Sequence, residues 1–293
     1  MGFVYALITS VFFTAYTIPK KISKQNTACY SMFQGMGYYL ASAAAYLVHI
    51  LLRGDGAEQI NDSRLIISAL TGVIWFTGCV FFFMAIDEMG LSRSNQWKNL
   101  QGPFGAVFNL LFLAEYQQTN VLFIVLSCAA ILISAMLLTV RAGSEKAVSK
   151  KGIVYSLLAA VFFGLNSMFL KIGTNNGFIF SQQLVIAGAV FFSSIVYILI
   201  KERGLPSVRS VPVKDNLLGI LGGALFCAAS LFSLRAYALL PGSVTFTIIQ
   251  LNAVWTVLAG VFIFREINFK SNWLRIVMGM VFAVVGVVML LWA

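Results

Sequence analysis

The stretch GFVYALITSVFFTAYTIPKKIS at residues 2–23 returns later in the chain as GIVYSLLAAVFFGLNSMFLKIG at residues 152–173. The two segments align without a gap at a constant offset of 150, and nine of the 22 positions are identical. Each is an apolar run of the length that one crossing of a bilayer requires, about 20 residues. The sequence therefore predicts two related membrane spans, one at the start of each half.

The composition extends this interpretation to the whole chain. Hydrophobic residues make up 60% of the sequence and charged residues only 10%, against roughly 45–50% and about 25% in soluble domains. A soluble enzyme is excluded, and we expect an all-α membrane protein with ten transmembrane helices. The apolar runs between charge clusters place them at residues 2–18, 27–52, 65–86, 91–113, 119–140, 152–170, 177–200, 216–239, 242–264 and 272–292.

A second pair of segments supports two related halves. Residues 68–120 align with 219–271 at an offset of 151, and this register pairs Gly72 with Gly223, Ser92 with Ser243 and Glu115 with Glu266. We expect one five-span repeat at residues 1–144 and a second at 145–293. Because five is an odd number, the two repeats would cross the membrane in opposite directions, as inverted repeats.

The basic residues are distributed unevenly among the connectors. Fifteen Lys and Arg residues fall in the connectors after odd-numbered spans and three in the connectors after even-numbered spans. The positive-inside rule then places the odd-numbered loops in the cytoplasm and both termini outside, in the cell membrane. The basic residues of these connectors also account for the net charge of +10. That charge is therefore no sign of nucleic-acid binding, and we expect no nucleic-acid partner.

Polar residues inside spans are costly, so they are the candidate substrate-binding residues. They lie on the predicted spans 4, 8 and 9, and are Asn95, Trp97, Lys98, Asn99, Gln101, Arg235, Gln250, Asn252 and Trp255. Weaker candidates are Tyr16, Gln34, Asn166, Gln182 and Gln183. In the register of the repeat, Asn99 and Gln101 align with Gln250 and Asn252, so these amides would converge near the midplane. Amides and indoles suit a neutral, hydroxyl-rich solute.

Each of these residues also has a structural interpretation. The amides could hydrogen-bond helices together, Lys98 could extend to the cytoplasmic headgroups, and Arg235 could be an interfacial anchor. The glycine-rich stretches 102–105 and 219–223 would allow close helix packing.

The residues needed for other chemistry are scarce. The chain has one His, and its four Cys residues stand apart with no metal-ligand spacing, so we expect neither a metal nor a cofactor. An intramembrane enzyme would need a metal cluster, paired acids or a nucleophile with a base. A proton-coupled exporter of cations would need a carboxylate within the membrane, and no acid lies deep in a predicted span.

The stretches GVIWFTG (72–78) and MGLSRSNQWKNLQGPFGAVFNLLFLAEY (89–116) carry a family resemblance. With the ten spans in two halves, the whole chain resembles the EamA-like members of the drug/metabolite transporter superfamily. Within it, the Gly-x-x-Trp of span 3, the Gly-x-Ser that opens span 4, the Gln one turn later and Glu115 look most like the glucose/ribose uptake and rhamnose transporter families. Lys98 departs from that pattern. It is similar to a basic residue of the organic-phosphate exchangers, but those also use a basic residue in span 9, where this chain has Ile249.

These observations predict a secondary transporter that moves a small polar metabolite, sugar-like or weakly anionic, by alternating access. Spans 3, 4, 8 and 9 would line the central cavity. The alternatives within the superfamily are an exporter of amino acids or cationic drugs, and an exchanger of organic phosphates or other anions. Coupling to H⁺, to Na⁺ or to exchange is open, as is the choice between a monomer and a homodimer.

Overall fold

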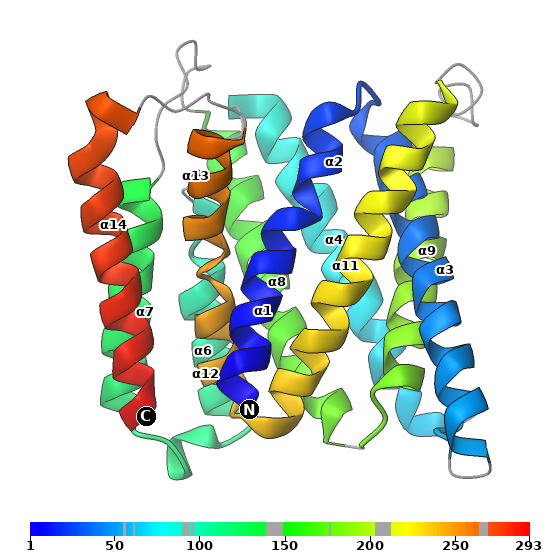
Figure 1. The fold of residues 1–293 in the computed structure, drawn as a ribbon, viewed down its shortest axis with the longest axis horizontal. Helices are drawn as coiled ribbons and strands as arrows, with labels where there is room; N and C mark the ends of the chain where they lie inside the picture. Colours follow the sequence, from blue (N-terminus) through cyan, green and yellow to red (C-terminus); the bar gives the residue numbers. More distant parts are fainter. Residues whose placement is uncertain are drawn as a thin grey trace.

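The structure is a computed structural model that describes residues 1–54, 57–60, 62–89, 94, 97–138, 149–175, 177–202, 212–263 and 269–293. Every regular element in these ranges is helical (Figure 1). The α-helices are α1 (Gly2–Ala15), α2 (Thr17–Ile22), α3 (Thr27–Arg53), α4 (Ile66–Met89), α6 (Gln101–Phe112), α7 (Val121–Leu138), α8 (Lys150–Thr174), α9 (Phe180–Glu202), α11 (Val213–Leu239), α12 (Gly242–Ile249), α13 (Asn252–Phe262) and α14 (Phe269–Met289). Short 3₁₀ turns are η2 (Ser63–Leu65), η3 (Glu115–Gln117) and η4 (Leu290–Trp292).

The expected all-α membrane architecture is confirmed for the described residues. Among them, eight helical segments are long and apolar enough to cross a membrane, as in a multi-pass membrane protein. The predicted spans 91–113 and 242–264 differ from the other eight. In the first, α6 has only 12 residues, and the second consists of α12 with 8 residues and α13 with 11. The site residue Asn95 and the repeat boundary at 144/145 lie outside the described residues.

Proline accounts for two of the interruptions. Inside a helix, a proline lacks the N–H of the helical ladder and its ring collides with the carbonyl four residues earlier. Pro19 follows Ala15, where α1 ends, by four residues. Pro103 follows Asn99 by the same spacing, and the chain turns there before α6 begins.

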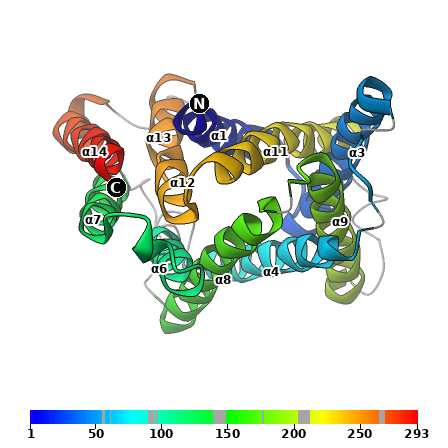
Figure 2. The same cartoon turned by 90° about the horizontal axis from the view of Figure 1, so that it is seen from below.

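The helices enclose the centre of the molecule as a ring (Figure 2). Helix α4 packs against α8 and α9, and α11 packs against α1 and α3. Helices α6 and α12 contact each other and close the ring towards α7 and α14, which form a pair at one side. Both termini lie at the same end of the bundle, the lower end in Figure 1.

Glycine residues allow the closest helix contacts, as expected for the stretch 219–223. A Cβ atom at Gly223 of α11 would collide with the Gln34 carbonyl of α3, and one at Gly72 of α4 would collide with the Ile186 carbonyl of α9. Gly72 and Gly223 are the pair aligned by the repeat, and each brings its helix against the backbone of a neighbour. Small residues have this role in membrane helices, where backbones pack closely without a hydrophobic driving force.

Candidate functional site

Two interruptions in the helices fall at positions that the repeat aligns. The chain turns at Asn99–Leu100 before α6, and at Gln250–Leu251 between α12 and α13. At the offset of 151, Asn99 aligns with Gln250 and Leu100 with Leu251. Two unrelated kinks would have no reason to fall in the same register.

The hydrogen bonds at the two turns also correspond. The N–H of Leu100 donates to the Trp97 carbonyl over 3.2 Å, and the N–H of Leu251 donates to the Ile248 carbonyl over 3.0 Å. Both bonds reach three residues back instead of four, which is the 3₁₀ pattern. A 3₁₀ stretch within a helix often marks a functional hinge, and interrupted membrane helices commonly form the substrate sites of transporters.

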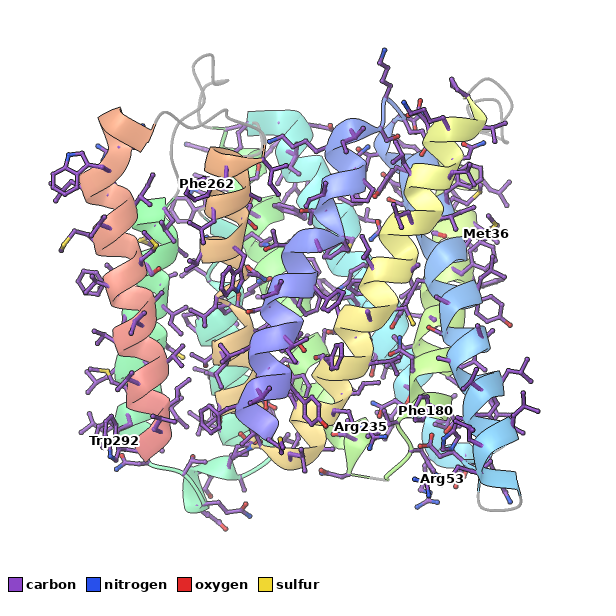
Figure 3. All side chains as sticks on the ribbon, in the orientation of Figure 1. Met36, Arg53, Phe180, Arg235, Phe262 and Trp292 are labelled. Carbon is purple, nitrogen blue, oxygen red and sulfur yellow. The ribbon has the colours of Figure 1, made fainter. Side chains whose placement is uncertain are left out.

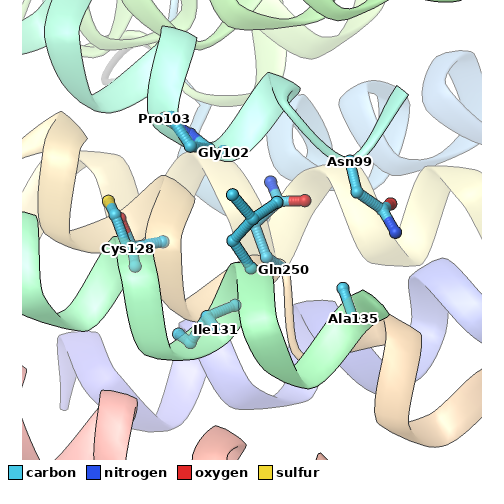
Figure 4. Close-up of a pocket in the computed structure, with 9 residues that line it drawn as sticks. Asn99, Gly102, Pro103, Cys128, Ile131, Ala135 and Gln250 are labelled. Carbon is cyan, nitrogen blue, oxygen red and sulfur yellow. The ribbon is translucent and has the colours of Figure 1, made fainter. Parts of the chain in front are cut away.

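The two interruptions touch through a pair of amides. Gln101 Nε2 donates to Gln250 Oε1 over 2.8 Å, and both side chains are buried. Gly102 makes room for the contact, because a Cβ atom there would lie 3.2 Å from Gln250 Cγ (Figure 4). The predicted convergence of the span 4 and span 9 amides therefore holds for this pair.

We call the contact between Gln101 and Gln250 the crossing. A small cavity lies beside it and has a volume of about 10 Å³, room for about one water molecule. Its lining residues come from α6, α7, α12 and the two turns, and are Asn99, Gly102, Pro103, Cys128, Ile131, Leu132, Ala135, Thr247 and Gln250. In this conformation the crossing is closed, so a larger ligand would need the helices to move apart.

Two further predicted residues of span 4, Trp97 and Lys98, lie among the described residues. The Lys98 ammonium lies 5.0 Å from the centre of the Phe82 ring and 5.9 Å from that of Phe163, so it makes cation–π contacts. The Trp97 side chain is 38% exposed.

The remaining residues of span 9 contact α1. The Trp255 indole Nε1 donates to Ser10 Oγ over 2.8 Å, and the carbonyl of Asn252 accepts the Thr14 hydroxyl over 3.0 Å. These bonds hold α13 against α1.

Arg235 lies outside this group of residues. Its side chain is exposed, and its guanidinium lies 5.7 Å from the centre of the Phe180 ring. Figure 3 shows both residues near the end of the bundle that carries the termini. The structure therefore does not bring Arg235 to the crossing.

An aromatic cluster surrounds Phe226, and Tyr16 is its only member among the predicted candidates, as one of the weaker ones. The Phe226 ring of α11 contacts Tyr38 of α3 at a centroid distance of 4.8 Å, Trp75 of α4 at 4.7 Å and Tyr16, which lies between α1 and α2, at 5.0 Å. One signal in the sequence could have pointed to it, because Trp75 and Phe226 are aligned at the offset of 151.

A second missed feature fixes the turn between α11 and α12. The buried Glu115 carboxylate accepts hydrogen bonds from the Ser243 N–H over 2.9 Å, from the Ser243 hydroxyl over 2.7 Å and from the Gly242 N–H. Lys171 Nζ donates to the carbonyls of Tyr237 over 2.7 Å and Leu240 over 2.9 Å. An acid at a helix start and a base at a helix end both complement the helix dipole, so the two side chains hold this turn from both sides.

Comparison with known proteins places the chain in a family. A family model described as sugar transport protein matches residues 41–293, which is most of the sequence. The chain belongs to the sugar transport protein family. Membership implies a transporter rather than an enzyme, and it agrees with the eight membrane-length helices.

Two individual proteins are similar to this member of the family. A protein of Listeria monocytogenes named "Putative sugar uptake protein lmo0424" is 22% identical over 256 residues, which cover 85% of this chain and 86% of that protein. A solved crystal structure superposes with a TM-score of 0.74 over 98% of this chain and 95% of the other, at 15% identity. At that identity the superposition shows a shared fold alone.

Proposed function

We propose that the protein moves a sugar or a similar polyol across the cell membrane by alternating access, with its substrate site between the two interrupted helices. The observation that carries this proposal is the contact between Gln101 and Gln250 at aligned interruptions. A carrier needs a site that either half can expose in turn, and transporters with inverted repeats have their sites near the midplane, where the repeats meet.

The proposal includes ten spans in two inverted repeats, residues 1–144 and 145–293, as in the drug/metabolite transporter superfamily. Aligned helices contact each other across the molecule, α3 with α9 and α7 with α14, and the two interrupted spans meet where α6 contacts α12. In addition, α4 packs on α8 just as its counterpart α11 packs on α1.

The direction of the helices supports the inversion. Gly2, at the start of α1, packs against the Leu240 side chain, and Lys171, near the end of α8, binds the Leu240 carbonyl. Helices α1 and α8 are aligned by the repeat, and these two contacts place the start of one beside the end of the other, as expected for inverted repeats. The same contact recurs in the other half. Gly152, the counterpart of Gly2, packs against Met89, the counterpart of Leu240.

The orientation in the membrane follows from the loop charges. With the odd-numbered loops in the cytoplasm, the end that carries both termini, together with Glu115 and Lys171, is the outer one. The turn that these two residues hold then belongs to the outer side of the transport pathway.

The chemistry of the crossing favours a neutral substrate. Amides donate to and accept from hydroxyl groups, and we propose that Asn95, Asn99, Gln101, Gln250 and Asn252 bind the hydroxyls while Trp97 and Trp255 cover apolar faces of the ring. Lys98 lies against two aromatic rings, which favours a sugar over an organic phosphate as the cargo.

Uptake into proteoliposomes tests the proposal. The purified protein is reconstituted, and the entry of labelled glucose, ribose and rhamnose is compared with that of an amino acid, an organic phosphate and a quaternary amine. We expect saturable entry of at least one sugar, none of the other classes, and a loss of entry in Gln250→Leu. Val125→Ala on the exposed face of α7 is the matched control. Selective transport of the phosphate or the amine would refute the proposal.

A further inference from the structure

The aromatic cluster around Phe226 joins the two halves of the molecule. Trp75 lies on α4 in the first half and Phe226 on α11 in the second, with ring centroids 4.7 Å apart and planes inclined by 31°. The two residues are counterparts in the repeat. Two counterparts that touch lie on the axis that relates the repeats, so both rings are placed where the halves meet.

A cavity of about 20 Å³ opens beside this ring pair. Its walls come from α3, α4, α9 and α11, and its lining residues are Ser31, Gln34, Gly35, Tyr38, Trp75, Phe76, Cys79, Phe83, Val190 and Phe226. Side chains of four helices from both halves therefore converge on one point.

Two polar groups at this cavity have no hydrogen-bond partner among the described residues. They are the side-chain amide of Gln34 and the indole N–H of Trp75, both only partly buried. A Trp N–H within a protein usually finds a partner, and an amide offers both a donor and an acceptor. The unused groups point to a ligand with hydroxyls rather than to an apolar core.

The wall behind the cavity is fixed by a buried network. The Tyr38 hydroxyl lies 3.0 Å from Ser230 Oγ, which donates to Gln183 Oε1 over 2.7 Å, and Gln183 Nε2 donates to Ser42 Oγ over 3.2 Å. The polar groups of this network are therefore hydrogen-bonded to each other, whereas those of Gln34 and Trp75 remain available to a ligand.

We propose that this cavity is a second subsite on the transport pathway, separate from the crossing of Gln101 and Gln250, where the ring of the sugar stacks on Trp75 and its hydroxyls bind Gln34. The inference rests on the proposed function. The apolar C–H face of a pyranose or furanose lies on the indole, whose face is electron-rich, and the Gln34 amide and Trp75 N–H bind its hydroxyls. Because the cavity is smaller than a sugar, Trp75 and Phe226 separate when the substrate enters.

Tryptophan fluorescence tests the platform directly, because the chain has only five Trp residues. The wild type, Trp75→Phe and a matched control, Trp292→Phe, are titrated in detergent with the sugar that the wild type transports. Trp292 is 60% exposed, and Trp97 and Trp255 stay in all three proteins. The Trp75 signal is the part of the saturable fluorescence change that is lost in Trp75→Phe at saturating sugar. We expect a clear loss in Trp75→Phe and the full wild-type change in Trp292→Phe.

Binding measurements by calorimetry complete the test. We expect Trp75→Ala and Gln34→Leu each to raise Kd about tenfold, and Trp75→Phe to raise it about threefold, because stacking survives and one hydrogen bond is lost. Unchanged melting temperature for Trp75→Phe confirms that the fold is intact. Wild-type sugar binding with no Trp75 signal and unchanged Kd in Gln34→Leu would overturn the subsite alone. A wild type that neither binds nor transports any sugar would overturn the proposed function with it.

Discussion

The interrupted helices of the two halves differ in what causes the interruption. In the first half both turns precede a proline, Pro19 for α1/α2 and Pro103 for α6. Their counterparts in the second half are Phe169 and Val254. Helix α8 accordingly passes Phe169 without a break, whereas α12 and α13 separate at Leu251 with no proline nearby.

The difference shows that the second turn depends on contacts with other helices. Val254 has an N–H and uses it to bond the Leu251 carbonyl over 2.9 Å, a bond that Pro103 cannot make. The turn at Leu251 is held instead by Gln101, which binds Gln250, and by Thr14, which binds the Asn252 carbonyl. A turn built on such contacts can straighten when they are lost, whereas a turn built on proline cannot.

The largest effect is expected where α12 begins. Glu115→Gln replaces an acceptor-only carboxylate by an amide whose NH₂ faces the N–H groups of Gly242 and Ser243. Two donors then face each other, so the free energy of unfolding should fall by about 2–3 kcal/mol. The melting temperature in detergent reports the change. Glu58→Gln is the matched control, since Glu58 also accepts the N–H and hydroxyl of a helix-start serine, Ser181, but is partly exposed. An equal fall in melting temperature in the two variants would contradict a larger contribution from the buried Glu115 carboxylate.

The amide pair at the crossing should have an intermediate effect. Gln101→Leu or Gln250→Leu alone leaves a buried amide unpaired, at a cost of about 1–2 kcal/mol in the free energy of unfolding. The double variant removes both groups and should recover most of that stability, yet we expect transport to be lost in all three. Stability and transport are measured on the same preparations. If the double variant also transports, the pair only holds the helices together and the substrate site lies elsewhere.

The sequence predicted the architecture better than the site. Repeat register and hydropathy placed the long helices and brought Gln101 to Gln250, because both signals are local or periodic. The register aligns Trp75 with Phe226 but did not mark them as a site, since aromatic residues in an apolar span look the same whether they face lipid, core or cavity. Nor could they find the rings around Lys98, because Phe82 and Phe163 come from two other helices. The turn at Leu251 was missed because nothing in its local sequence imposes it.

The smallest effect on stability is expected at the proline itself. Pro103→Ala restores the N–H that can bond the Asn99 carbonyl, so the turn before α6 can relax into a regular helix. We expect the free energy of unfolding to change by less than about 1 kcal/mol, because the helix bond gained is offset by the greater freedom of the unfolded chain. Transport should nevertheless slow several-fold, since a straightened turn moves Gln101 away from Gln250. Val254→Ala at the matching position keeps the N–H and the turn, so its transport should stay within twofold of the wild type after correction for expression. Equal slowing in both variants would mean that proline does not hold the first turn, and that both interruptions depend on the contact between them.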